Sequence, residues 1–95
     1  MLKHTQLMKN LKLNNTEKGQ IWQLIEKYDS YVKRGFSQYL ELSESLSSVL
    51  KDEASDNDLM NITKFMDWDT IGESDFRILD STVGSAIDEM FFKMN

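Results

Sequence analysis

Apolar residues recur along this chain at spacings of three and four, which predicts amphipathic α-helices. The clearest stripe runs through residues 21–32, where isoleucine, leucine, tyrosine and valine fall on one side of a helix. Asn14 or Thr16 is the expected N-cap of this helix, and Asn14 has Glu17 three residues later, as a capping box requires. Gly35 predicts the end of the helix, because glycine accepts the positive φ of a C′ residue.

Two more helices are expected in the middle of the chain. Ser37 is placed to cap the first of them, which continues to Leu50. Ser55 or Asp56 is placed to cap the second, which fades over residues 67–72. The positions of these two helices that we expect to face the core are Tyr39, Leu42, Leu46, Val49, Leu50, Leu59, Ile62 and Met66.

The C-terminal segment carries the longest apolar stripe, and we expect a helix that starts after Ser74. Gly84 interrupts this helix at a cost of about 1 kcal/mol relative to alanine. We therefore expect Gly84 to mark a close approach of a neighbouring helix. The stripe consists of Phe76, Leu79, Val83, Ala86, Ile87, Met90 and Met94.

These patterns predict an all-α fold, a compact bundle of four to five short amphipathic helices. The chain has no proline and four glycines, and no stretch alternates apolar and polar residues as a strand does. Its 95 residues suit one domain, residues 1–95, with a free energy of unfolding on the order of 5–10 kcal/mol. We expect residues 1–15 to form a loosely attached N-terminal helix, with Leu7, Met8 and Leu11 on one face.

Charge is divided unevenly along the chain. Residues 1–34 carry seven Lys or Arg against three acids, whereas residues 35–95 carry four against thirteen. The net charge of −5 disfavours direct binding of nucleic acid, because phosphate repels an acidic surface. The chain has no cysteine, no apolar signal segment and no stretch of about 18 apolar residues that would cross a membrane. We therefore expect a cytoplasmic protein.

The sequence offers no catalytic, metal or cofactor motif, so we expect no enzyme activity and no cofactor. His4 is the only histidine and lies near a terminus that is expected to fray. Residues 67–72 resemble the opening of a calcium-binding loop, but Ile71 and Ile78 stand at ligand positions 5 and 12. The bidentate glutamate of such a loop is therefore missing.

A cluster of acids in the second half of the chain is the best candidate for a functional surface. Clustered like charges repel one another and attract partners of opposite sign. Several of these acids also stand at predicted helix N-termini, where the helix dipole stabilises them and no binding role is needed. The cluster consists of Asp52, Glu53, Asp56, Asp58, Asp67, Asp69, Glu73 and Asp75.

Three apolar residues, Trp68, Ile78 and Phe92, lie opposite the main stripes of their helices. One interpretation is that they pack against a second layer of the bundle. The other is that they are exposed anchors in an acidic surround, as at many interfaces. The predicted partner-binding residues are Asp56, Asp58, Asp67, Trp68, Asp69, Glu73, Asp75 and Ile78.

Size and charge favour a small acidic inhibitor of immunity-protein type. Such a protein neutralises a basic partner, either a nuclease-like toxin or another nucleic-acid-binding protein, through a face rich in carboxylates. One alternative is a phage-type DNA mimic that regulates a nucleic-acid-binding protein. Another is a structural or assembly adaptor, similar to a secretion chaperone, which would self-associate or hold a partner helix. We expect a monomer or a weak homo-oligomer that contacts no membrane.

Overall fold

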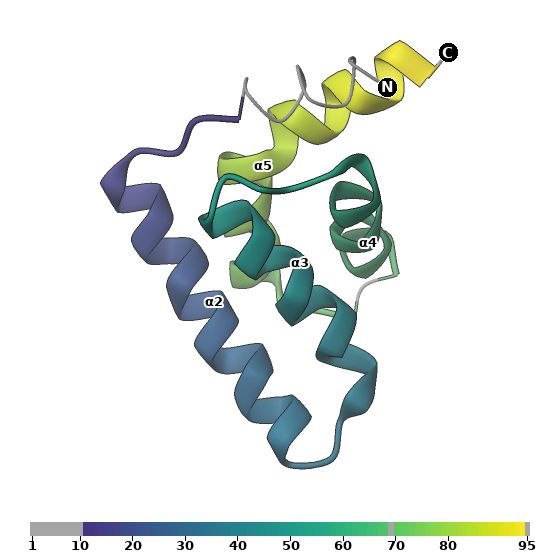
Figure 1. Ribbon diagram of the computed structural model, residues 1–95. Coiled ribbons are helices and arrows are strands. Elements are labelled where there is room, and N and C mark those ends of the chain that lie inside the picture. Colours follow the sequence, from purple (N-terminus) through teal and green to yellow (C-terminus); the bar gives the residue numbers. More distant parts are fainter. Residues whose placement is uncertain (1–10, 69, 95) are drawn as a thin grey trace.

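The structure, a computed structural model, describes residues 11–68 and 70–94, which form four α-helices and one short 3-10 helix without any strand. The α-helices are α2 (Asn15–Lys33), α3 (Leu40–Leu50), α4 (Asp56–Asp67) and α5 (Glu73–Met94), and the 3-10 helix η1 (Ser37–Tyr39) precedes α3. The predicted all-α bundle of short helices is confirmed (Figure 1). The expectations for His4, Leu7, Met8 and the side chain of Met94 lie outside the described residues. Of the N-terminal helix expected over residues 1–15, the described residues 11–14 are not helical.

Both ends of α2 have the predicted chemistry. The Asn14 side chain accepts a hydrogen bond from the Glu17 backbone N–H at 2.8 Å, and the Glu17 side chain accepts one from Asn14 at 2.9 Å. At the other end Gly35 has a φ of 106°. The Phe36 N–H donates to the Tyr31 carbonyl at 3.0 Å, so the helix ends in a Schellman motif. Local residue chemistry therefore determines where α2 begins and ends.

The start of α3 differs from the prediction that Ser37 caps it. Residues 37–39 form the 3-10 helix η1, and no side chain caps either η1 or α3. The Tyr39 N–H donates to the Phe36 carbonyl at 3.1 Å, so tight i→i+3 bonds supply the acceptor that a serine cap would have provided. The α-helix itself starts at Leu40.

The predicted cap of α4 is correct, whereas α5 begins earlier than predicted. Ser55 accepts a hydrogen bond from the Asp58 backbone N–H at 3.2 Å, and the Asp58 side chain accepts one from Ser55. Helix α5 starts at Glu73, ahead of the expected start after Ser74. The Phe76 N–H donates to the Gly72 carbonyl at 2.9 Å, which adds the extra residues to the first turn.

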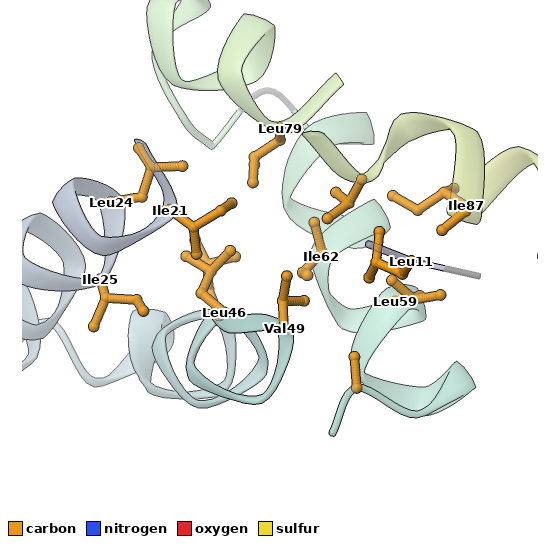
Figure 2. Packing of buried hydrophobic residues seen from close by; sticks show 14 of the residues in the cluster. Leu11, Ile21, Leu24, Ile25, Leu46, Val49, Leu59, Ile62, Leu79 and Ile87 are labelled. Atoms are coloured by element: carbon orange, nitrogen blue, oxygen red, sulfur yellow. The ribbon is translucent and has the colours of Figure 1, made fainter. Parts of the chain in front are cut away.

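The four helices pack around one apolar core. Helices α2 and α3 share the most extensive contact, α3 packs on α4, and α5 lies across both α2 and α4 (Figure 1). Side chains from all four helices converge on the same interior (Figure 2). The residues that Figure 2 labels there are Leu11, Ile21, Leu24, Ile25, Leu46, Val49, Leu59, Ile62, Leu79 and Ile87.

Phe76 does not belong to this core, contrary to the stripe predicted for the last helix. Its side chain is 39% exposed, while Asp75 beside it is buried. The buried face of α5 passes through Asp75, Leu79 and Thr82, so Phe76 lies at its edge. Asp75 faces the interior because its carboxylate bonds to Tyr28 and Lys27 of α2, and the ring of Phe76 therefore faces outward.

None of the helices in the described residues is long and apolar enough to cross a membrane.

Candidate functional site

Asp75 is a structural residue inside the bundle. Its carboxylate accepts a hydrogen bond from the Tyr28 hydroxyl at 2.5 Å and forms an ion pair with the Lys27 ammonium at 2.8 Å. The side chain of Asp75 is 8% exposed. These contacts join the first turn of α5 to the middle of α2. The sequence predicts that Asp75 binds a partner. In the structure Asp75 is buried, and its carboxylate is bonded to residues of α2.

The contacts of Asp75 also predict that the protein loses stability at alkaline pH. Burial and the hydrogen bond to Asp75 raise the pKa of Tyr28 far above its ordinary value of 10.0, and the hydrogen bond to Asp75 raises the pKa of Lys27 above 10.5. Both groups hold their protons more tightly in the folded state, so their stabilisation is complete below about pH 10 and decreases as the pH rises. For Tyr28 the loss is about 1.4 kcal/mol per pH unit.

Urea unfolding followed by circular dichroism over the alkaline range measures this loss. We expect Tyr28→Phe to flatten the dependence of the unfolding free energy on pH above about pH 10. Tyr31→Phe is the control, because the Tyr31 ring packs on the ring of Tyr28 but its hydroxyl makes no bond to Asp75. An unchanged slope in Tyr28→Phe would contradict the assignment.

Asp56 and Asp58 lie in the first turn of α4, where acids suit the positive end of the helix dipole. Asp58 completes the capping box with Ser55 and also accepts a hydrogen bond from the Ser45 hydroxyl of α3 at 3.1 Å. The Asn61 amide donates to the same Ser45 hydroxyl at 3.3 Å. This network joins α3 to α4. The Asp58 carboxylate is therefore bonded within the chain, contrary to the expectation that it is available to a partner.

Glu73 and Ile78 are each engaged within α5 or with the core. The Glu73 carboxylate forms an exposed i, i+4 ion pair with Arg77 at 2.7 Å. Ile78 is partly buried and packs against the core, which matches the interpretation of a second packing layer. Phe92 matches the other interpretation, since it is 81% exposed. Asp69 lies outside the described residues.

Trp68 is the most exposed tryptophan, at 69%, and it caps the C-terminal end of α4. It lines a pocket of about 360 Å³ together with Tyr39, Phe65, Lys64 and other residues of η1, α3 and α4. The rings of Tyr39 and Phe65 are stacked with their centroids 5.9 Å apart. Of the two interpretations of Trp68, its exposure argues against packing in a second layer, and its role as an aromatic anchor stays a prediction. Because Lys64 offsets Glu41 among the lining residues, this pocket favours neither sign of charge.

A second hollow, which we call the α4–α5 groove, lies between those two helices and is acidic. Its lining residues are Thr63, Met66, Asp67, Phe76, Asp80, Gly84, Ile87, Asp88 and Phe91, and its volume is about 250 Å³. Three carboxylates and no base are present among them. Within the described part of the chain, no ion pair joins Asp67, Asp80 or Asp88 to a base.

The α4–α5 groove is also apolar enough to bind a protein surface. Phe76 and Phe91, near its two ends, are 39% and 38% exposed, and Met66 and Ile87 lie between the helices. Exposed aromatic rings beside carboxylates are typical of interface hot spots. Of the predicted site residues that the structure describes, the groove contains Asp67 and no other.

Sequence reasoning missed Asp80, Asp88, Phe76 and Phe91 as site residues. Asp80 and Asp88 follow Asp75, the last acid of the main cluster, on the same predicted helix, and sequence reasoning did not count them in it. A signal was nevertheless present: residues 80, 84 and 88 are four apart and therefore lie on one face of a helix. The acids lie on the same face as the helix-interior glycine.

Gly84 forms part of the groove, contrary to the expectation that another helix packs on it. A Cβ added to Gly84 would lie 2.9 Å from the Asp80 carboxylate oxygen, and no other helix of the described residues comes within 4 Å. The glycine therefore leaves room for the side chain of Asp80 on its own helix.

We expect Gly84→Ala to raise the free energy of unfolding by about 0.5–1 kcal/mol, because alanine is the better helix former and the Asp80 carboxylate can move away. Thermal unfolding by calorimetry measures the change. Gly19→Ala in α2 is a matched control, since nothing lies within 4 Å of its added Cβ. A large destabilisation by Gly84→Ala would mean that the Asp80 side chain cannot move.

No group of three or more His, Asp or Glu side chains in residues 11–68 and 70–94 is arranged to hold a metal ion. The chain matches no family model, no curated protein and no solved structure.

Proposed function

We propose that this protein binds a basic protein and blocks its working surface, as a small inhibitor of immunity-protein type does. The α4–α5 groove is the observation that carries the proposal. It combines three carboxylates and two exposed phenylalanines in one hollow, and none of the described residues that line it is a base. Proteins that bind nucleic acid present basic surfaces to phosphate, and a carboxylate-lined apolar groove is complementary to such a surface.

The acids of the groove are not the set that the sequence predicts. Asp67 remains, while Asp80 and Asp88 replace Asp58 and Asp75, which are bonded within the fold. Exposed carboxylates that form no ion pair with another described residue suit a binding surface, because they lose no such contact when a partner arrives. They also accelerate encounter with a basic partner.

Affinity capture from the native host at two salt concentrations tests the proposal. The bait is the full chain, and the candidates include the product of the adjacent gene. We expect a basic nucleic-acid-binding protein to be held stoichiometrically at low salt and released at about 1 M salt, where the screening length falls to about 3 Å. Purified partner activity, measured with and without the protein, then shows whether binding inhibits it.

An adaptor role is the second candidate, because large apolar side chains are exposed away from the groove. Trp22 is 51% exposed and Phe92 is 81% exposed. An adaptor would self-associate or hold an apolar partner with little dependence on salt. Sedimentation analysis of the protein alone, together with the high-salt capture, distinguishes the two functions. Capture of a basic regulator without nuclease activity would favour the DNA-mimic form of the inhibitor.

A further inference from the structure

Gly84 lies at an unusual place for a glycine. It is in the interior of α5, where glycine is an unfavourable residue, and its backbone is buried. Among the described residues, the Asp80 carboxylate of the same helix is the one group that comes within 4 Å of the position of a Cβ. Packing between the described helices therefore does not account for the glycine. The Asp80 carboxylate, which also lines the groove, takes the space that a side chain at position 84 would occupy. The missing side chain makes room for the Asp80 carboxylate inside the groove, where a cationic group of another molecule can reach it.

The groove extends far enough along α5 to lie beside several turns of another helix. Its lining residues on α5 run from Phe76 to Phe91, which spans about 22 Å at 1.5 Å per residue. Asp80 and Asp88 stand about 12 Å apart along the same axis, or two helical turns. Peptide strands bind by adding to a free sheet edge, and the described residues contain no sheet. An amphipathic helix needs no such edge, because its backbone hydrogen bonds are internal.

We infer that the α4–α5 groove binds one basic amphipathic helix of the partner. Apolar residues of that helix rest on the exposed rings of Phe76 and Phe91, and the helix lies along α5. Lysine or arginine residues seven or eight positions apart pair with Asp80 and Asp88. This inference rests on the proposed function, since it assumes a basic partner, and it adds the conformation and the spacing that the groove recognises.

Three synthetic peptides test the inference with the full-length protein. The first is a leucine–lysine peptide of about 18 residues, patterned as an amphipathic helix with lysines two turns apart. The second has glutamate in place of each lysine. The third keeps the lysines but carries a central proline, which breaks the helix. Binding is followed by amide chemical shifts in 15N–1H spectra and by calorimetry.

We expect only the first peptide to bind, with shifts concentrated at residues 63–67 and 76–91. Gly84→Leu fills the groove and should weaken binding about tenfold or more. Gly84→Ala is the milder variant, with a smaller loss in the same direction. Ser85→Leu is the matched control, because Ser85 is exposed on α5 but does not line the groove, and it should bind normally. Circular dichroism verifies that each variant is folded.

Other outcomes overturn the inference in distinguishable ways. Equal binding of the proline peptide would reject recognition of a helix, while salt-dependent capture of a basic partner would leave the proposed function standing. If the glutamate peptide bound as tightly as the lysine peptide, both the helix inference and the proposed preference for a basic partner would be rejected. A protein that dimerises with shifts at the groove, and binds no peptide, would identify a second copy as the occupant. Normal binding by Gly84→Leu would place the peptide elsewhere on the surface.

Discussion

Replacing Asp75 with alanine is expected to lower the free energy of unfolding by about 3 kcal/mol. The change leaves the buried Tyr28 hydroxyl without its acceptor, which costs about 1–3 kcal/mol, and removes a charge-assisted bond worth about 1.5–3 kcal/mol. Lys27 contributes less to the loss, because its side chain is 44% exposed and water can solvate it. For a chain whose total stability is on the order of 5–10 kcal/mol, this is a large fraction. Urea unfolding at neutral pH measures it.

Two variants make this result specific to Asp75. Asp75→Asn keeps an acceptor for Tyr28 and loses only the charge, so we expect about half the effect. Glu73→Ala removes an exposed ion pair from the same turn of α5 and should cost less than about 1 kcal/mol. Equal losses from Glu73→Ala and Asp75→Ala would show that helix-terminal charge, and not the buried contact, carries the stabilisation.

Reversing three charges in the α4–α5 groove is expected to weaken partner binding about a thousandfold. The variant carries Asp67→Lys, Asp80→Lys and Asp88→Lys, and the loss corresponds to about 4 kcal/mol. Lysines placed against a basic partner create like-charge contacts in addition to removing attractive ones. Because these three acids make no ion pair in the described structure, the helicity should be retained. Calorimetry with the captured partner, at low and high salt, measures the change.

A second triple variant controls for net charge. Glu26→Lys, Glu44→Lys and Glu53→Lys make the same change in charge at exposed positions outside the groove. We expect this variant to slow association slightly and to leave the affinity within about tenfold of wild type. If both variants lost affinity equally, the partner would be responding to the overall field of the protein and not to the groove.

Local rules accounted for most of the helices and several of their ends. The cap of α2 at Asn14 and of α4 at Ser55, and the positive φ of Gly35, all follow from residues within a few positions of one another. The start of α3 did not follow, because a 3-10 turn satisfied the backbone groups that a Ser37 cap would have satisfied. Where a side-chain cap and a 3-10 turn satisfy the same backbone groups at similar energy, tertiary packing determines which of them forms.

The candidate site was harder to predict for a physical reason. Whether an acid is a surface charge or an internal acceptor depends on what lies opposite it, and Asp75 faces a tyrosine 47 positions earlier in the chain. No local pattern contains that information. Density along the sequence therefore grouped Asp58, Asp67 and Asp75, which the fold separates into a cap, a groove and a core contact.

The contact between α2 and α5 has a consequence for folding kinetics. Helices that follow one another along the chain pack together, from α2 on α3 to α4 on α5. Such contacts between segments close in sequence favour fast folding. The bonds from Asp75 to Lys27 and Tyr28 instead close a loop of almost fifty residues, so they are expected to form after the barrier has been crossed. Substitutions at Asp75 should then accelerate unfolding more than they slow folding. Asp75 governs how long the folded chain persists more than how quickly it assembles.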